Sequence, residues 1–130
     1  MRITGLRPAD TAARLGGDEF AVLLEGLADV DEAARVAKRI ADALRTPFDL
    51  AGGRETFATA SIGVALGAAA RKGPQGLMRD ADLAMCQAKR SGKARYVLYE
   101  EAMAARALER LELTSDLRRA LSREELALHY

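Results

Sequence analysis

A Gly-Gly-Asp-Glu tetrapeptide at residues 16–19 lies between two runs of apolar, strand-prone residues, and it constrains the fold more than any other feature. We predict a β-hairpin over residues 13–24, because adjacent glycines supply the positive φ angles that a tight turn needs. Glycines also let a ligand approach the backbone, and neighbouring carboxylates suit a divalent cation. A solvated hairpin tip with no function is the alternative interpretation of these residues.

The composition bounds the class of protein. A length of 130 residues with 49% hydrophobic content fits one globular domain. The net charge of +1 gives no case for a nucleic-acid partner. The uncharged run 57–70 is too short and too rich in small polar residues to cross a bilayer, so we expect no direct membrane contact. The single cysteine, Cys86, is consistent with a cytoplasmic setting, and any membrane anchor would lie outside this segment.

Periodicity predicts the other elements. Apolar stripes predict helices at residues 30–45, 77–91 and 100–121. Strands are predicted at residues 48–51, 55–66 and 96–99, with apolar alternation in the second of them. Asp29 and Glu32 have the spacing of a capping box at the start of the first helix. Gly63, inside a strand, indicates close approach of a neighbouring element. A break in the last helix near residues 114–115 stays open, because Thr or Ser can cap a new helix.

Several sequence blocks resemble the GGDEF family of diguanylate cyclases, in the family's order and at about its spacing. They are residues 16–20, 59–65, 81–85 and 88–93. The resemblance implies an α/β (α+β) fold related to nucleotidyl cyclases, with a mainly antiparallel sheet flanked by helices. It covers only the C-terminal part of that domain, so we expect the N-terminal half, with its central first strand, to be missing.

The resemblance also implies how the chain is divided. Residues 1–99 correspond to a partial GGDEF domain, and residues 100–123 to a helical connector. Residues 124–130 resemble the start of a truncated EAL domain, the cyclic di-GMP phosphodiesterase. The EAL domain of the same parent chain is therefore an expected partner.

Site residues follow from matching positions in the family. Asp18 and Glu19 are implied to be catalytic and to bind the metal cofactor, Mg²⁺ or Mn²⁺. The positions implied to bind GTP are Gly16, Gly17, Lys89 and Lys93. The family more often has Arg where this chain has Lys93, and lysine keeps the charge without the planar fork.

A product-binding site is implied upstream of the hairpin. Arg7 and Asp10 form an R-x-x-D pair at the offset of the family's inhibitory site for cyclic di-GMP, and Arg39 matches a further contact from a helix. Arginine suits this task because its planar fork binds phosphate oxygens and stacks on guanine. The alternative is a surface turn with a local ion pair.

The full protein is therefore implied to be a nucleotidyltransferase that condenses two GTP molecules, with a second GGDEF domain as its homodimer partner. This chain lacks the upstream aspartate and the guanine-binding residues of the family, so we expect it to be inactive alone. One alternative is a regulatory module that binds GTP or cyclic di-GMP and controls a downstream EAL phosphodiesterase. A structural spacer is the other.

Overall fold

The computed structural model describes residues 6–50, 53–67, 73–123 and 125. Its elements in chain order are β1 (Thr11–Gly16), β2 (Glu19–Leu23), α1 (Val30–Arg45), β3 (Phe48–Leu50), β4 (Arg54–Thr56), β5 (Ile62–Val64), α2 (Gly73–Arg90), β6 (Tyr96–Leu98) and α3 (Glu101–Ser122). Within these residues the strands form three two-stranded sheets, β1–β2, β3–β4 and β5–β6. The first two are antiparallel and the third is parallel. This mixed α/β arrangement confirms the predicted fold class.

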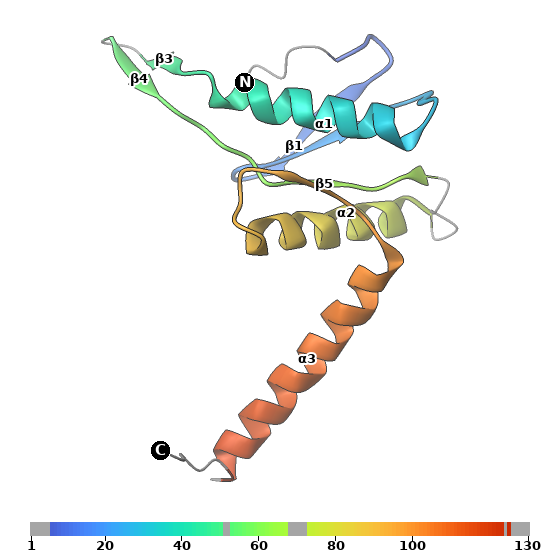
Figure 1. The fold of residues 1–130 in the computed structure, drawn as a ribbon, viewed down its shortest axis with the longest axis vertical. Helices are drawn as coiled ribbons and strands as arrows, with labels where there is room; N and C mark the ends of the chain where they lie inside the picture. The colour runs from blue at the N-terminus through green and yellow to red at the C-terminus, as the bar shows by residue number, and fades with distance from the viewer. Residues whose placement is uncertain (1–5, 51–52, 68–72, 124, 126–130) are drawn as a thin grey trace.

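The core lies around the β5–β6 pair. Both strands contact α1 and α2, and in Figure 1 the pair runs between these two helices. The least exposed side chains are small: Ala84 and Ala88 on α2 have no exposed surface, and Ala33 on α1 is 2% exposed. Small side chains let helices and strands approach closely, so the core is thin and rich in alanine.

Helix α1 has the predicted bounds, because its first turn is capped. Asp29 Oδ1 accepts a hydrogen bond of 2.7 Å from the backbone N–H of Glu32. Glu32 Oε2 in turn accepts one of 2.9 Å from Ala28 N–H, one residue before the donor that a capping box uses. The apolar stripe then buries Ala33, Val36, Ala37 and Ala41.

Gly63 confirms the expected close approach. A Cβ atom at this position would lie 1.9 Å from the backbone oxygen of Ala81 and 2.4 Å from the backbone nitrogen of Met85. Both atoms belong to α2, so the helix backbone lies directly on β5. No other residue type fits here without moving the helix.

Two predicted boundaries are wrong. The long strand over residues 55–66 is interrupted: β4 ends at Thr56 and β5 begins at Ile62, with no strand pairing between them in the described chain. Phe57, in this gap, is 69% exposed. Helix α2 begins at Gly73, four positions before the predicted start at residue 77. Pro74 is compatible with a first turn, where its missing N–H costs nothing.

Helix α3 extends away from the rest of the molecule and contacts α2 near its own start (Figure 1). It is continuous through residues 114–115, since Thr114 Oγ1 donates to the Arg110 carbonyl at 2.7 Å within the helix. None of its residues is buried, and Leu111 is 68% exposed. Among the described helices, none is both long and apolar enough to cross a membrane. The predicted EAL-like start, residues 124–130, lies outside the described residues except for Glu125.

Candidate functional site

The turn of the β1–β2 hairpin carries the two carboxylates. Gly16 pairs with Glu19, so Gly17 and Asp18 form the loop, and the register shifts between Arg14 and Gly16. Among residues 16–19, only Gly17 has a positive φ, at 51°. The expectation that both glycines adopt this conformation is wrong for Gly16, because a two-residue loop can close with one such residue at its first position.

Asp18 and Glu19 are both exposed. Exposed carboxylate oxygens are ligands that Mg²⁺ accepts, and Mg²⁺ is commonly held by one or two carboxylates together with water and substrate phosphates. In the described part of the chain, no group of three or more His, Cys, Asp or Glu residues could hold a metal ion. The donor set therefore fits a partial, phosphate-completed metal site rather than a closed protein cage.

Arg14 is a residue of this site that the sequence analysis did not single out. Its Nε and Nη2 atoms donate to the Gly17 carbonyl oxygen at 3.0 and 2.7 Å. Its guanidinium lies 5.9 Å from the ring centroid of Phe20, its cross-strand partner. Arg14 thus fixes the peptide group immediately before Asp18. The hairpin register, which places an arginine opposite an aromatic residue, is the signal that could have identified it.

Lys89 lies in the last turn of α2 and Lys93 lies just after the helix, and both are exposed. Lys93 N–H donates to the Ala88 carbonyl at 3.0 Å, which closes the helix in the manner of a Schellman motif. Three successive residues have positive φ: Gly92 at 107°, Lys93 at 60° and Ala94 at 49°. In the view of Figure 1 this loop and the hairpin turn lie at the same end of the molecule. Lys93 and Ala94 are not glycines, so their positive φ angles strain the backbone, and such strain is concentrated at ligand-binding sites.

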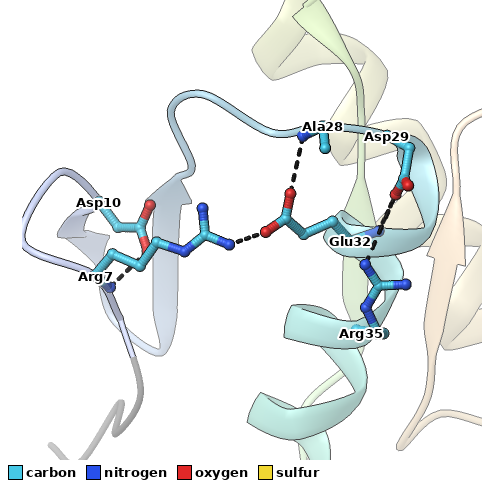
Figure 2. Close-up of polar contacts among 6 residues, drawn as sticks. All are labelled: Arg7, Asp10, Ala28, Asp29, Glu32 and Arg35. Atoms are coloured by element: carbon cyan, nitrogen blue, oxygen red, sulfur yellow. Dashed lines mark hydrogen bonds and ion pairs between the residues drawn. The ribbon is translucent and has the colours of Figure 1, made fainter.

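Arg7 and Asp10 form a closed turn through one backbone–backbone and one backbone–side-chain hydrogen bond. Arg7 N–H donates to Asp10 Oδ2 at 2.7 Å, and Asp10 N–H donates to the Arg7 carbonyl at 3.0 Å. Figure 2 shows that the Arg7 side chain extends past Asp10 and that its guanidinium pairs with Glu32 on α1. The local ion pair considered in the sequence analysis is therefore not between Arg7 and Asp10.

Arg39 is exposed on α1. It lies on the same face of α1 as Glu32, because positions i and i+7 coincide after two helical turns. Glu32 thus connects the R-x-x-D turn to the helix face that carries Arg39. The sequence indicated Glu32 only as a capping residue.

Asp80 is a second residue that the sequence analysis did not single out, because a charged side chain on a helix is ordinarily exposed. It is 4% exposed, and its Oδ1 atom has no hydrogen-bond partner among the described residues. Arg79 Nη2 lies 3.6 Å from this oxygen. Burial raises the pKa of the Tyr99 phenol above its usual range, and the Asp80 carboxylate raises it further.

Most of the chain matches a known protein family. Residues 3–95 match the family model described as diguanylate cyclase, GGDEF domain. The bifunctional diguanylate cyclase/cyclic di-GMP phosphodiesterase MucR of Pseudomonas aeruginosa is 42% identical over 125 residues. That match covers 96% of this chain and 18% of MucR. The cyclic di-GMP phosphodiesterase NbdA of the same species is 34% identical over 125 residues, covering 96% of this chain and 16% of NbdA.

Solved structures give the same result for the fold. A structure of TpbB from Pseudomonas aeruginosa that comprises only the GGDEF domain superposes with a TM-score of 0.75 and 40% sequence identity. The superposition covers 80% of this chain and 60% of the TpbB structure. The chain therefore spans about three fifths of the TpbB structure and less than a fifth of each of these two curated relatives.

Proposed function

The chain belongs to the GGDEF family of diguanylate cyclases, and on this premise we propose that it is the C-terminal part of a domain that condenses two GTP molecules into cyclic di-GMP. The observation that carries this proposal is the intact turn at residues 16–19, where Asp18 and Glu19 are exposed. Arg14 holds the carbonyl of Gly17 with two donors. A spacer without a ligand has no need of this arrangement.

Each site residue has a physical role in this proposal. Asp18 and Glu19 would hold a divalent cation, Mg²⁺ or Mn²⁺, which when bound neutralises phosphate charge. Gly16 and Gly17 leave open space: a Cβ atom at either would meet nothing within 4 Å, so a nucleotide can approach the backbone. The exposed cations that would hold phosphate oxygens are Lys89 and Lys93.

Helix α3 supports a further part of the proposal, that an EAL domain follows in the parent protein. The alignments with MucR and NbdA each cover 96% of the chain, so they extend beyond the family match at residue 95 into α3. Both relatives are named as cyclic di-GMP phosphodiesterases. We place residues 100–123 as the connector to that domain, in a cytoplasmic protein.

Residues 1–130 alone are expected to be inactive. The described residues offer two carboxylates at the turn and no larger acidic or metal-binding group. The test is to incubate the purified chain with GTP and Mg²⁺ and to measure cyclic di-GMP by mass spectrometry. We expect no product above an Asp18→Ala control. The same substitution in the parent protein should abolish synthesis, and continued synthesis there would overturn the assignment of Asp18.

Product inhibition through Arg7, Asp10 and Arg39, and dimerisation with a second GGDEF domain, complete the proposal. The half-exposed Arg7 guanidinium supports it, because a phosphate can reach this group. A regulatory module is the second candidate, favoured by the similarity to NbdA, which is named for phosphodiesterase activity alone. If GTP changes the phosphodiesterase rate of the parent protein while no cyclic di-GMP is made, the regulatory function is the correct one.

A further inference from the structure

Glu32 has a carboxylate with both oxygens engaged. Its Oε1 atom pairs with the Arg7 guanidinium, and its Oε2 atom accepts 2.9 Å from Ala28 N–H (Figure 2). Its backbone is fixed as well, because its own N–H donates to the capping Asp29. The Glu32 side chain is 16% exposed, whereas that of Arg7 is 50% exposed. The pair therefore has one anchored member and one accessible member.

Arg7, the accessible member, is the residue that an anionic ligand would bind. Among the described residues, Glu32 is the partner of the Arg7 guanidinium, while Arg7 N–H is occupied by Asp10. A guanidinium binds carboxylate and phosphate through the same planar fork. A phosphate that approaches Arg7 thus meets a guanidinium whose Nη2 atom already contacts Glu32, and it meets the negative charge of that carboxylate.

We propose that Glu32 is a counter-ion that holds Arg7 closed, and that a phosphate group of cyclic di-GMP must displace it to bind. This inference rests on the proposed product site at Arg7 and Asp10, and it assigns the regulation of that site. An ion pair whose arginine is half-exposed suits such an exchange, because pairs that are open to solvent contribute little net free energy. A fully buried pair would be too costly to open.

The opposite role, in which Glu32 orients Arg7 for the ligand, makes the opposite prediction. An orienting carboxylate would raise affinity by keeping the guanidinium in place. Glu32 instead places a negative charge against the group that the anionic ligand must reach. Like charges at such short range repel, so removing the Glu32 charge should strengthen binding.

The displacement also has a structural consequence. Ala28 lies between β2 and α1, in the segment that follows the β1–β2 hairpin. When Glu32 releases Arg7, its carboxylate is free to rotate, which alters the acceptor of the Ala28 N–H. Ligand binding at Arg7 is thereby connected to the chain that leaves the hairpin.

The experiment measures cyclic di-GMP binding to residues 1–130 by calorimetry. Glu32→Gln removes the charge but keeps an oxygen acceptor for Ala28, and we expect it to bind about fivefold more tightly than the wild type at low salt. The gain should shrink at high salt because the repulsion is screened. Asp31→Asn is the matched control: it removes the neighbouring acidic charge of the same helical turn and should leave affinity unchanged.

Arg7→Ala separates the two proposals. If the wild type binds and Arg7→Ala does not, the product site is correct, and unchanged or weaker binding by Glu32→Gln then overturns the counter-ion role. If no variant binds, or Arg7→Ala binds as the wild type does, the product site and this inference both fail. The amide resonance of Ala28 gives a second readout: it should shift on ligand addition in the wild type, and a silent Ala28 in a chain that binds through Arg7 overturns the displacement.

Discussion

The β1–β2 hairpin and the β5–β6 pair differ in how they are packed. Every residue of β1 is exposed, and within the described structure β1 and β2 contact each other far more than any other element. The β5–β6 pair contacts two helices and has no fully exposed residue. The residues proposed for chemistry therefore lie largely in the part of the molecule that contributes least to its core. Substitutions in the two regions should affect different measurements.

The largest expected effect comes from the packed region. Gly63→Ala would place a Cβ atom 1.9 Å from the Ala81 carbonyl oxygen, and helix backbone cannot yield as a flexible side chain does. We expect the free energy of unfolding to fall by about 3 kcal/mol or more, a large share of the roughly 5–15 kcal/mol that stabilises a domain. Urea denaturation followed by circular dichroism measures this.

Gly67→Ala is the matched control for that substitution. A Cβ atom at Gly67 meets nothing within 4 Å, and its φ is not in the left-handed region. Its effect should stay within about 0.5 kcal/mol of the wild type. Equal stability of the two variants would show that α2 does not lie on β5 as described.

A smaller and more local effect is expected in the hairpin. Arg14→Lys removes the two-donor contact with the Gly17 carbonyl and the planar group above Phe20. We expect amide hydrogen exchange at Gly17 and Asp18 to accelerate several-fold, while the global free energy of unfolding changes by less than about 1 kcal/mol.

Arg54→Lys provides the comparison, because Arg54 is an exposed arginine at the start of β4 in the other antiparallel hairpin. This substitution should leave amide hydrogen exchange at Gly17 and Asp18 unchanged. If Arg14→Lys lowers global stability as Gly63→Ala does, the hairpin is not independent of the core, and the distinction between the two regions is wrong.

The smallest expected effect is confined to alkaline pH. Burial, followed by the charge of Asp80, raises the pKa of Tyr99 above the value of 10.0 that an unfolded tyrosine has. The folded state thus favours the neutral phenol, so this contribution to stability is complete below pH 10 and is lost as pH rises through the folded pKa. Tyr99→Phe should therefore lose less stability than the wild type above pH 10.

Ultraviolet titration of the tyrosines checks this directly. Asp80→Asn should lower the pKa of Tyr99, because it removes the carboxylate charge beside the phenol. Tyr96→Phe serves as the control, because it changes a different tyrosine, on β6, and should leave the raised pKa of Tyr99 in place. A late titration that survives in Tyr99→Phe contradicts the assignment.

Local patterns predicted local structure well. The glycine pair gave the hairpin, the stripe with its capping residues gave the bounds of α1, and Gly63 indicated a close neighbour. Each of these depends on residues near one another in sequence. Alternation over residues 55–66 identified the apolar face of a predicted strand but not the strand that pairs with it. It could not show at which residues the strand pairing is interrupted.

The side-chain contacts that organise the candidate site were harder to predict. The hydrogen bonds from Arg14 to the Gly17 carbonyl depend on the exact hairpin register. The ion pair between Glu32 and Arg7 depends on how α1 lies against the preceding turn. Asp80 follows the helical period of α2 but carries a charge, so its burial could not be expected from apolar patterning. The family resemblance supplied roles for single residues and said nothing of these contacts.

The parallel pairing of β5 with β6 has a consequence for the order in which the chain folds. The two strands are separated in sequence by all of α2, so their ladder must wait until that helix has closed a long loop. The β1–β2 hairpin needs only its own residues, and hairpins of this kind form in about 1–10 μs. As the ribosome releases the chain from its N-terminal end, the turn that carries Asp18 and Glu19 assembles before the strand pair that completes the core.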